Sequence, residues 1–461
     1  MNEIEFPRGS DGRRSSSALG RTVVADALRV ADPAAADAAT RETDWRKGYP
    51  AHFRALVEAG LDGGYDIARA GLASVRRQMQ LGETPTGEGT PPGTVTVTGE
   101  EKAERELVIP YRKELLTGGA LSRQLDAWVE RGIIEASCAE MVREVAANPD
   151  WLDLCDQRLV VLGAGAEMGP LPAVLGWGGT VVGIDLPRPQ LWERVAATAR
   201  KSAGTLIAPG ATVETAGIDL LKDLPAALGW VLGIEGRLVL GNYVYAPGAA
   251  YALLSAAVDA LAGQVQRERP GTALAFLATP TDVFAVPGDA VAQSTARFRD
   301  RSGTARLTGT LSGGRLLRPN YPPGADPGIA DSLVPQQGPN YALAKRIQRW
   351  RASVARHEGT TVSFSVAPPT QTRSVTNNRI LAAAYAGAHM FGVEIFEPAT
   401  SNRLMAALLV HQLRKPRPAA ARVWTDEATG AAHGGLWRGA YQPRTALGLA
   451  AVRGLPAAVI R

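Results

Sequence analysis

The segment that most constrains the fold of this chain is residues 158–185, RLVVLGAGAEMGPLPAVLGWGGTVVGID. It begins with a continuous apolar run at 159–162, which is typical of a parallel strand covered on both faces. Three glycines follow at once: Gly163, Gly165 and Gly169. A second apolar run, 180–184, ends at Asp185. Strand, glycine turn, helix, strand and carboxylate in this order predict a nucleotide-binding unit of an open α/β sheet.

Each part of this unit has an expected role toward a nucleotide. A tight glycine turn lets backbone N–H groups approach a pyrophosphate at the N-terminus of a helix. Glu167 and Met168 lie within this turn and are expected to contact the same ligand. Asp185 is expected to accept hydrogen bonds from ribose hydroxyls. The alternative is a structural turn of an α/β domain, with Asp185 capping the loop that follows.

Short apolar runs alternate with helical segments from residue 156 onward, and this alternation predicts a doubly wound parallel sheet. We expect strands at 159–163, 180–184, 205–208, 237–241, 273–279 and 361–367. An insert rich in Gly, Pro, Arg and Ser, 287–340, interrupts the rhythm. A loop of this length is usually functional, so we expect a lid over the substrate pocket. Its mobility would come from Gly303, Gly313 and Gly314.

The remaining segments divide the chain into four parts. We expect a mobile N-terminal arm over 1–40 and a helical N-terminal unit over 41–150. A Pro/Gly/Thr linker at 82–99 would interrupt that unit. The sheet domain would cover 151–445, and 446–461 would form a C-terminal tail.

Composition excludes several classes of protein. The net charge is +5 over 461 residues and is not gathered in basic runs, which argues against nucleic acid as a partner. The sequence offers neither an uninterrupted apolar span nor a signal-peptide core, so we expect a cytoplasmic protein without a membrane segment. The five histidines and the two cysteines, Cys138 and Cys155, lack ligand spacing, so no metal is expected.

Tyr341 and Lys345 form the second informative feature, because a spacing of four residues places both side chains on one face of a helix. An ammonium group beside a phenol lowers a pKa that ordinarily lies near ~10. The pair would then serve as a proton donor and acceptor near neutral pH. The alternative is a solvated helix face that carries both residues by chance.

With this pair in place, the chain resembles the short-chain dehydrogenase/reductase family. The glycine turn, the acid after the second strand and the Tyr-x-x-x-Lys helix match the motifs of that family in order. Further counterparts lie between and after them: Asp219 with Leu220, Asn242, Thr279 or Thr281, and Pro368 with Thr372. The chain departs from the family where Leu171 stands near the expected third glycine, and where a threonine replaces the expected serine.

The resemblance implies a Rossmann fold and an NAD(P)-dependent oxidoreductase that moves hydride between a nicotinamide cofactor and a small carbonyl or alcohol molecule. Tyr341 would be the proton donor or acceptor, and Lys345 would bind the nicotinamide ribose and lower the pKa of Tyr341. Thr279 or Thr281 would polarise the substrate oxygen. Asp185 favours NAD, whereas Arg188 leaves NADP open. The family precedent also leaves a homo-oligomer open.

Two other classes remain open. Class I methyltransferases, which use S-adenosylmethionine, also begin with a strand, a glycine turn and an acid after the second strand. They usually place an acid just before the glycine turn, where this chain has Val161 and Leu162. A non-catalytic dinucleotide-binding or scaffold protein is the other alternative, because the family serine is absent and the insert is long.

Overall fold

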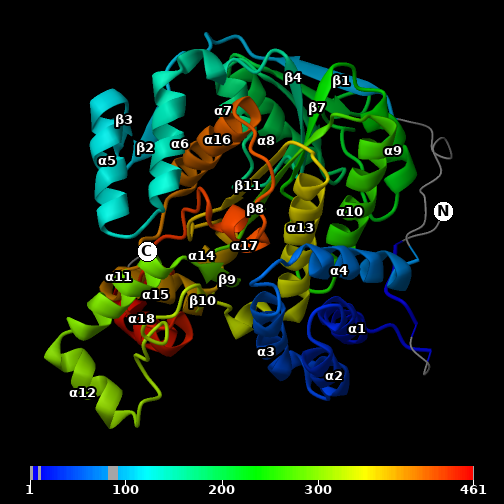
Figure 1. Cartoon of the computed structure of the whole chain (residues 1–461). Helices are drawn as coiled ribbons and strands as arrows, with labels where there is room; N and C mark the ends of the chain where they lie inside the picture. Colours follow the sequence, from blue (N-terminus) through cyan, green and yellow to red (C-terminus); the bar gives the residue numbers. More distant parts are fainter. Residues whose placement is uncertain (1–3, 9–11, 81–91, 460–461) are drawn as a thin grey trace.

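The computed structural model describes residues 4–8, 12–80 and 92–459, and a seven-stranded sheet runs through its centre (Figure 1). The sheet has the order β1-β6-β5-β4-β7-β8-β11. Its strands are β1 (Thr94–Thr98), β4 (Gln157–Leu162), β5 (Thr180–Ile184), β6 (Thr205–Pro209), β7 (Arg237–Asn242), β8 (Ala273–Ala278) and β11 (Val362–Val366). All neighbours from β6 to β11 are parallel, whereas the edge strand β1 is antiparallel to β6.

All six strands expected from the sequence are present. Numbered along the chain from β4, these parallel strands lie in the order 3-2-1-4-5-6, which is the arrangement of doubly wound dinucleotide-binding folds. The chain therefore has a Rossmann-like α/β fold.

Helices cover both faces of this sheet, as the apolar character of β4 requires. Leu159 and Val161 point into one core, and Val160 and Leu162 into the other. The first core contains α6 (Ala136–Ala147), α7 (Leu171–Gly176), α8 (Pro189–Arg200) and α16 (Pro398–Arg414). The second contains α9 (Leu224–Leu232), α10 (Ala250–Glu268) and α13 (Pro339–His357).

The expectation of a mobile arm over 1–40 is wrong for most of that range. Four helices stand at the start of the chain: α1 (Ser16–Arg29), α2 (Pro33–Arg41), α3 (Trp45–Glu58) and α4 (Tyr65–Gln78). Leu19, Val23 and Leu28 recur at helical spacing in α1 and are buried. They share a core with α10 and α13, so these helices pack against the sheet domain instead of forming a separate unit.

Residues 92–152 also differ from the expected helical unit and linker. The described part of the expected linker contains β1, because the β-branched residues of TVTVT favour a strand. Residues 81–91 lie outside the described ranges. A hairpin of β2 (Ile109–Tyr111) and β3 (Glu114–Leu116) follows. Then come α5 (Gly118–Glu130), α6 and the short 3-10 helix η1 (Pro149–Leu152).

The expected insert is largely structured. Its elements are α11 (Gly288–Arg299), α12 (Gly303–Leu311), β10 (Gly328–Asp331) and the 3-10 helix η2 (Pro335–Gln337). Strand β10 pairs with β9 (Val283–Val286), which immediately precedes the insert. Helix α12 projects from the body of the molecule (Figure 1) and has no buried residue.

Residues 446–459, where a tail was expected, belong to the last helix of the described chain. The last elements are α14 (Arg373–Thr376), α15 (Arg379–Gly387), the 3-10 helix η3 (Ala388–Phe391), α16, α17 (Val423–Ala428) and α18 (Pro443–Val459). Helix α18 packs closely on α15, because glycine and alanine at their contact let the backbones approach. The packing of small residues therefore orders a segment whose sequence shows little amphipathic character.

Candidate functional site

A cavity of about 1090 Å³ lies at the carboxyl ends of four neighbouring strands. Its wall includes the residues that follow β4, β7, β8 and β11, among them Gly165, Tyr243, Thr279 and Pro368. In open α/β sheets, ligands bind at this edge, where the strand order reverses. Here the reversal falls between β4 and β7, so the cavity lies where the topology predicts a ligand.

All four predicted catalytic residues, Tyr341, Lys345, Thr279 and Thr281, line this cavity. Tyr341 and Lys345 lie one turn apart on α13, and Thr279 lies just beyond the end of β8. The Lys345 Nζ donates to the Leu277 carbonyl oxygen (3.2 Å) and to Gln348 Oε1 (3.1 Å). Lys345 is therefore held against β8, on the helix face that also presents Tyr341.

The pKa of Tyr341 differs from the sequence expectation. Burial raises it to about 12, although the charge of Lys345 and a hydrogen bond with Thr279 act in the opposite direction. Burial also lowers the pKa of Lys345. Lys345 thus lowers the pKa of Tyr341 as expected, but desolvation of the phenol raises it by more. Tyr341 is therefore a phenol at neutral pH.

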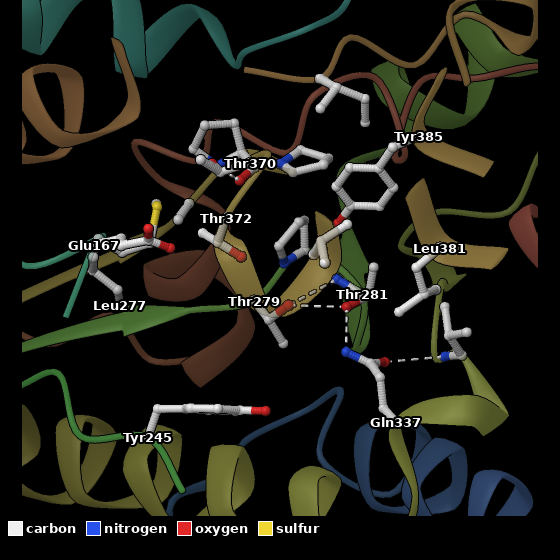
Figure 2. A pocket seen from close by; sticks show the side chains of 18 of the residues that line it. Glu167, Tyr245, Leu277, Thr279, Thr281, Gln337, Thr370, Thr372, Leu381 and Tyr385 are labelled. Atoms are coloured by element: carbon white, nitrogen blue, oxygen red, sulfur yellow. Dashed lines mark hydrogen bonds between the residues drawn. The ribbon is translucent and has the colours of Figure 1, made fainter. Parts of the chain in front are cut away.

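Thr279 and Thr281 belong to a short chain of hydrogen bonds (Figure 2). Their hydroxyl oxygens lie 2.9 Å apart, and Gln337 Nε2 donates to Thr281 Oγ1 over 2.7 Å. The backbone N–H of Val334 donates to Gln337 Oε1 (3.3 Å). Gln337 was not predicted as a site residue, since a single glutamine in a loop gives no sequence signal.

A buried ionic network fixes α13 beneath the cavity. Arg349 donates to Asp282 Oδ2 (2.7 Å) and to both oxygens of Glu427 (2.7 Å each). Arg346 reaches Asp282 Oδ1 at 3.3 Å. Asp282 and Arg349 are almost fully buried, and removing one partner of such a network leaves an uncompensated charge. The network therefore ties the helix of Tyr341 to the loop after β8 that carries Thr279.

The glycine turn after β4 lines one end of the cavity but differs from the predicted form. Gly163 has φ +90, and a Cβ there would lie 2.8 Å from the Tyr243 carbonyl oxygen. Gly165, Glu167 and Met168 line the cavity. The expected helix does not begin at the turn, because α7 starts only at Leu171 and lasts six residues. The helix N-terminus is thus displaced from the glycines.

The two acids expected to hold adenosine lie outside the cavity. Asp185 Oδ2 accepts the Gly165 N–H and Oδ1 accepts the Leu186 N–H, both at 2.8 Å. Burial raises the pKa of Asp185 despite these two donors. Asp219 Oδ1 accepts the Leu221 N–H (3.0 Å). Both acids therefore organise loops, and the alternative of a loop-capping Asp185 describes its contacts.

Other predicted cofactor residues divide between the cavity wall and the protein core. Pro368 and Thr372 line the cavity. Leu220 is 5% exposed and packs in the core beneath β7. Asn242 ends β7, is also buried, and its Oδ1 finds no hydrogen-bond partner among the described residues. Gly169 accepts a hydrogen bond from Asn402 Nδ2 through its carbonyl oxygen.

Two arginines of the cavity wall were not predicted. Arg194, on α8, lies beside the glycine turn. Arg373, at the start of α14, pairs with Glu167 through its Nε (3.0 Å) and its backbone N–H (2.8 Å). The pair joins the glycine turn to the loop after β11. Arginine is frequent in this chain, so neither position gives a sequence signal.

The expected lid contributes only its last part to the cavity. Ser332, Val334, Gln336 and Gln337 belong to the wall. Helix α12 and the glycines at 303, 313 and 314 do not. Residues of α15 and α18 also line the cavity.

No protein-family model matches this chain, and no curated protein is significantly similar to it. Among the described residues, no group of three or more His, Cys, Asp or Glu side chains is placed to hold a metal ion. No helix within the described ranges is both long and apolar enough to cross a membrane. The site must therefore be interpreted from its own geometry.

Proposed function

We propose that this protein is an oxidoreductase that acts on a carbonyl or alcohol group with a nicotinamide dinucleotide, NAD or NADP. The observation that supports it best is the meeting of Tyr341, Lys345 and Thr279 on one wall of a large cavity. That cavity lies at the strand edge where such folds bind dinucleotides. Its volume lies at the upper end of the usual range for ligand pockets, about 1,000 Å³.

The cavity residues fit the nicotinamide and phosphate parts of the cofactor. Lys345 and Thr372 offer hydrogen-bonding groups near the reactive end, and Arg194 offers a positive charge beside the glycine turn. The adenosine part has no such match, because Asp185 and Asp219 do not line the cavity. When bound, the dinucleotide supplies or accepts the hydride.

The chain's own residues provide the proton and the orientation. The Tyr341 phenol donates its proton to the oxygen of a carbonyl substrate, or accepts one from an alcohol in reverse. The Thr279 hydroxyl lines the same cavity wall and polarises the same oxygen. Lys345 lowers the pKa of Tyr341 from the higher value that burial alone would impose.

The test is a comparison of Tyr341→Phe with wild-type protein. We expect turnover on a panel of alcohols and aldehydes to fall by about 10²–10⁴, the usual contribution of a general acid. Stabilisation of the protein by NADH or NADPH in a thermal melt should persist. Tyr65→Phe is the matched control, since Tyr65 stacks on His357 away from the cavity. Undiminished turnover in Tyr341→Phe would refute the mechanism.

The same melts address the other two classes. Stabilisation by S-adenosylmethionine and not by dinucleotides would indicate a methyltransferase. Stabilisation by a dinucleotide, with no turnover on the whole panel, would indicate a non-catalytic dinucleotide-binding protein.

A further inference from the structure

The cavity has an apolar wing at the end opposite the glycine turn. Figure 2 shows Thr279 and Thr281 between Glu167 on one side and Leu381 and Tyr385 on the other. We define the apolar wing by its lining residues from α15, η3 and α18: Leu381, Ala384, Tyr385, Phe391, Ala446 and Leu447. The two threonines after β8 therefore lie between two ends of different chemistry.

Charge is distributed unevenly between these two ends. The charged side chains of the cavity wall are Glu167, Arg194, Lys345 and Arg373. They come from the glycine turn, α8, α13 and α14. No described residue that lines the apolar wing carries a charge. Burying an unpaired charge is costly, so a charged substrate body would be disfavoured in the wing.

The apolar wing is formed mainly by two helices, α15 and α18, that pack tightly against each other. Helices α15 and α18 approach so closely that a Cβ on Gly454 would collide with the Ala383 carbonyl oxygen. A Cβ on Gly387 would collide in the same way with the Ala450 carbonyl oxygen. Backbone packing of this kind fixes the two helices relative to each other. The wing consequently keeps its shape and provides room beyond the reactive end.

We propose that the substrate is an uncharged, elongated and largely apolar alcohol or carbonyl compound. Its oxygen lies at Tyr341 and Thr279, and its hydrocarbon body fills the apolar wing. This inference rests on the proposed oxidoreductase function for the placement of the oxygen. Its affinity comes mainly from removing the hydrocarbon from water, which grows with each buried methylene.

The test measures binding without any dinucleotide. The uncharged fluorophore N-phenyl-1-naphthylamine is bound to the full-length protein and displaced by unbranched 1-alkanols of increasing length. We expect the apparent Kd to fall about threefold to fourfold per added methylene until the wing is filled. Alkanoates of equal length should bind more weakly than the alkanols. Binding that ignores chain length, or that favours the carboxylates, would overturn the proposal.

Paired variants connect the binding to the apolar wing. Leu447→Glu and Leu381→Glu place a carboxylate in the wing and should raise the Kd of a long alkanol at least about tenfold. Val452→Glu and Ile380→Glu are the matched controls on the same two helices, because these side chains are 64% and 71% exposed. Controls that weaken binding as strongly would place the alkanol outside the wing.

A volume-filling variant covers the case in which the carboxylate variants do not fold. Leu447→Trp keeps the wing apolar and shortens it. The gain in affinity with chain length should therefore stop at a shorter alkanol than in the wild type, and an unchanged profile would count against the proposal.

Failure of the substrate proposal can be told apart from failure of the proposed function. Alkanol binding that depends on chain length and on Leu447, without turnover in the presence of NAD(P), would refute only the oxidoreductase. Turnover of short polar alcohols, with no benefit from chain length, would refute only the apolar substrate.

Discussion

The two halves of the sheet's carboxyl edge are used differently. Beyond β7, β8 and β11, polar side chains such as Thr279 and Thr372 line a cavity. Beyond β5 and β6, Asp185 and Asp219 accept backbone N–H groups and lie outside that cavity. On the same side, the Leu191 side chain packs against the glycine turn, since a Cβ on Gly165 would lie 3.1 Å from it. One half lines the cavity, and the other organises the neighbouring loops.

The contacts of Asp185 show that an acid after the second strand can hold two loops together, which is a role other than ribose binding. Each Asp185 oxygen accepts one backbone N–H, and the two donors come from the glycine turn and the loop after β5. A carboxylate engaged in this way fixes the turn directly. Each oxygen keeps a second lone pair, so these two bonds alone do not prevent Asp185 from accepting a further hydrogen bond.

The pH dependence of turnover should give the largest effect. In the proposed oxidation the phenolate of Tyr341 accepts the alcohol proton, and the pKa of Tyr341 is about 12. Below that pKa the ionised fraction rises tenfold per pH unit, so kcat/KM for alcohol oxidation should rise about tenfold per unit from pH 6 to 9. Carbonyl reduction uses the phenol and should stay nearly flat.

Steady-state rates in both directions across this pH range measure the effect. Tyr341→Phe is the control, because it should remove the rise in the oxidation profile. A plateau below pH 8 would mean that bound ligands lower the pKa of the Tyr341 phenol toward neutrality.

Replacing Asp185 tests the supporting half of the edge. Asp185→Ala leaves the N–H groups of Gly165 and Leu186 without their acceptor, so the free energy of unfolding should fall by about 1–3 kcal/mol. The preference between NAD and NADP should not change, because Asp185 does not line the cavity. Urea denaturation and thermal melts with each dinucleotide measure the two effects.

Asp219→Ala is the matched comparison on the same half. Asp219 accepts one backbone N–H at its Oδ1, so a smaller loss of about 1 kcal/mol or less is expected. If Asp185→Ala instead reversed the dinucleotide preference and left stability intact, the end of β5 would hold the ribose. Both halves of the carboxyl edge of the sheet would then contact the ligand.

The sequence was sufficient for the six parallel strands of the sheet but only partly for the site. Apolar runs located all six parallel strands, since burial on both faces requires such runs. The contacts of Asp185 could not be predicted, because they depend on how two loops approach each other. Strand β1 was missed, since a five-residue TVTVT segment beside a Pro/Gly stretch also fits a linker. The positions of helices α15 and α18 could not be predicted, because they depend on the packing of small residues that lie far apart in the sequence.

Arg194 offers a third test, at the border between the two halves. Arg194→Gln should weaken NADH binding about tenfold, which is about 1.4 kcal/mol, because it removes a positive charge from the cavity wall beside the glycine turn. Arg188→Gln is the control: Arg188 precedes the same helix but does not line the cavity. Equal losses in both variants, measured by calorimetry, would show that the ligand extends over the end of β5.

The smallest effect is expected at the pair that joins the two sides of the cavity. Glu167→Gln weakens the link to Arg373, whose side chain is 70% exposed, so the free energy of unfolding should change by less than about 1 kcal/mol. Because the pair joins the glycine turn to the loop after β11, dinucleotide dissociation should nevertheless become faster. Stopped-flow release of NADH measures this rate, with Glu193→Gln on α8 as an exposed ion-pair control. Unchanged release in Glu167→Gln would mean that the two sides of the cavity hold the ligand independently of this link.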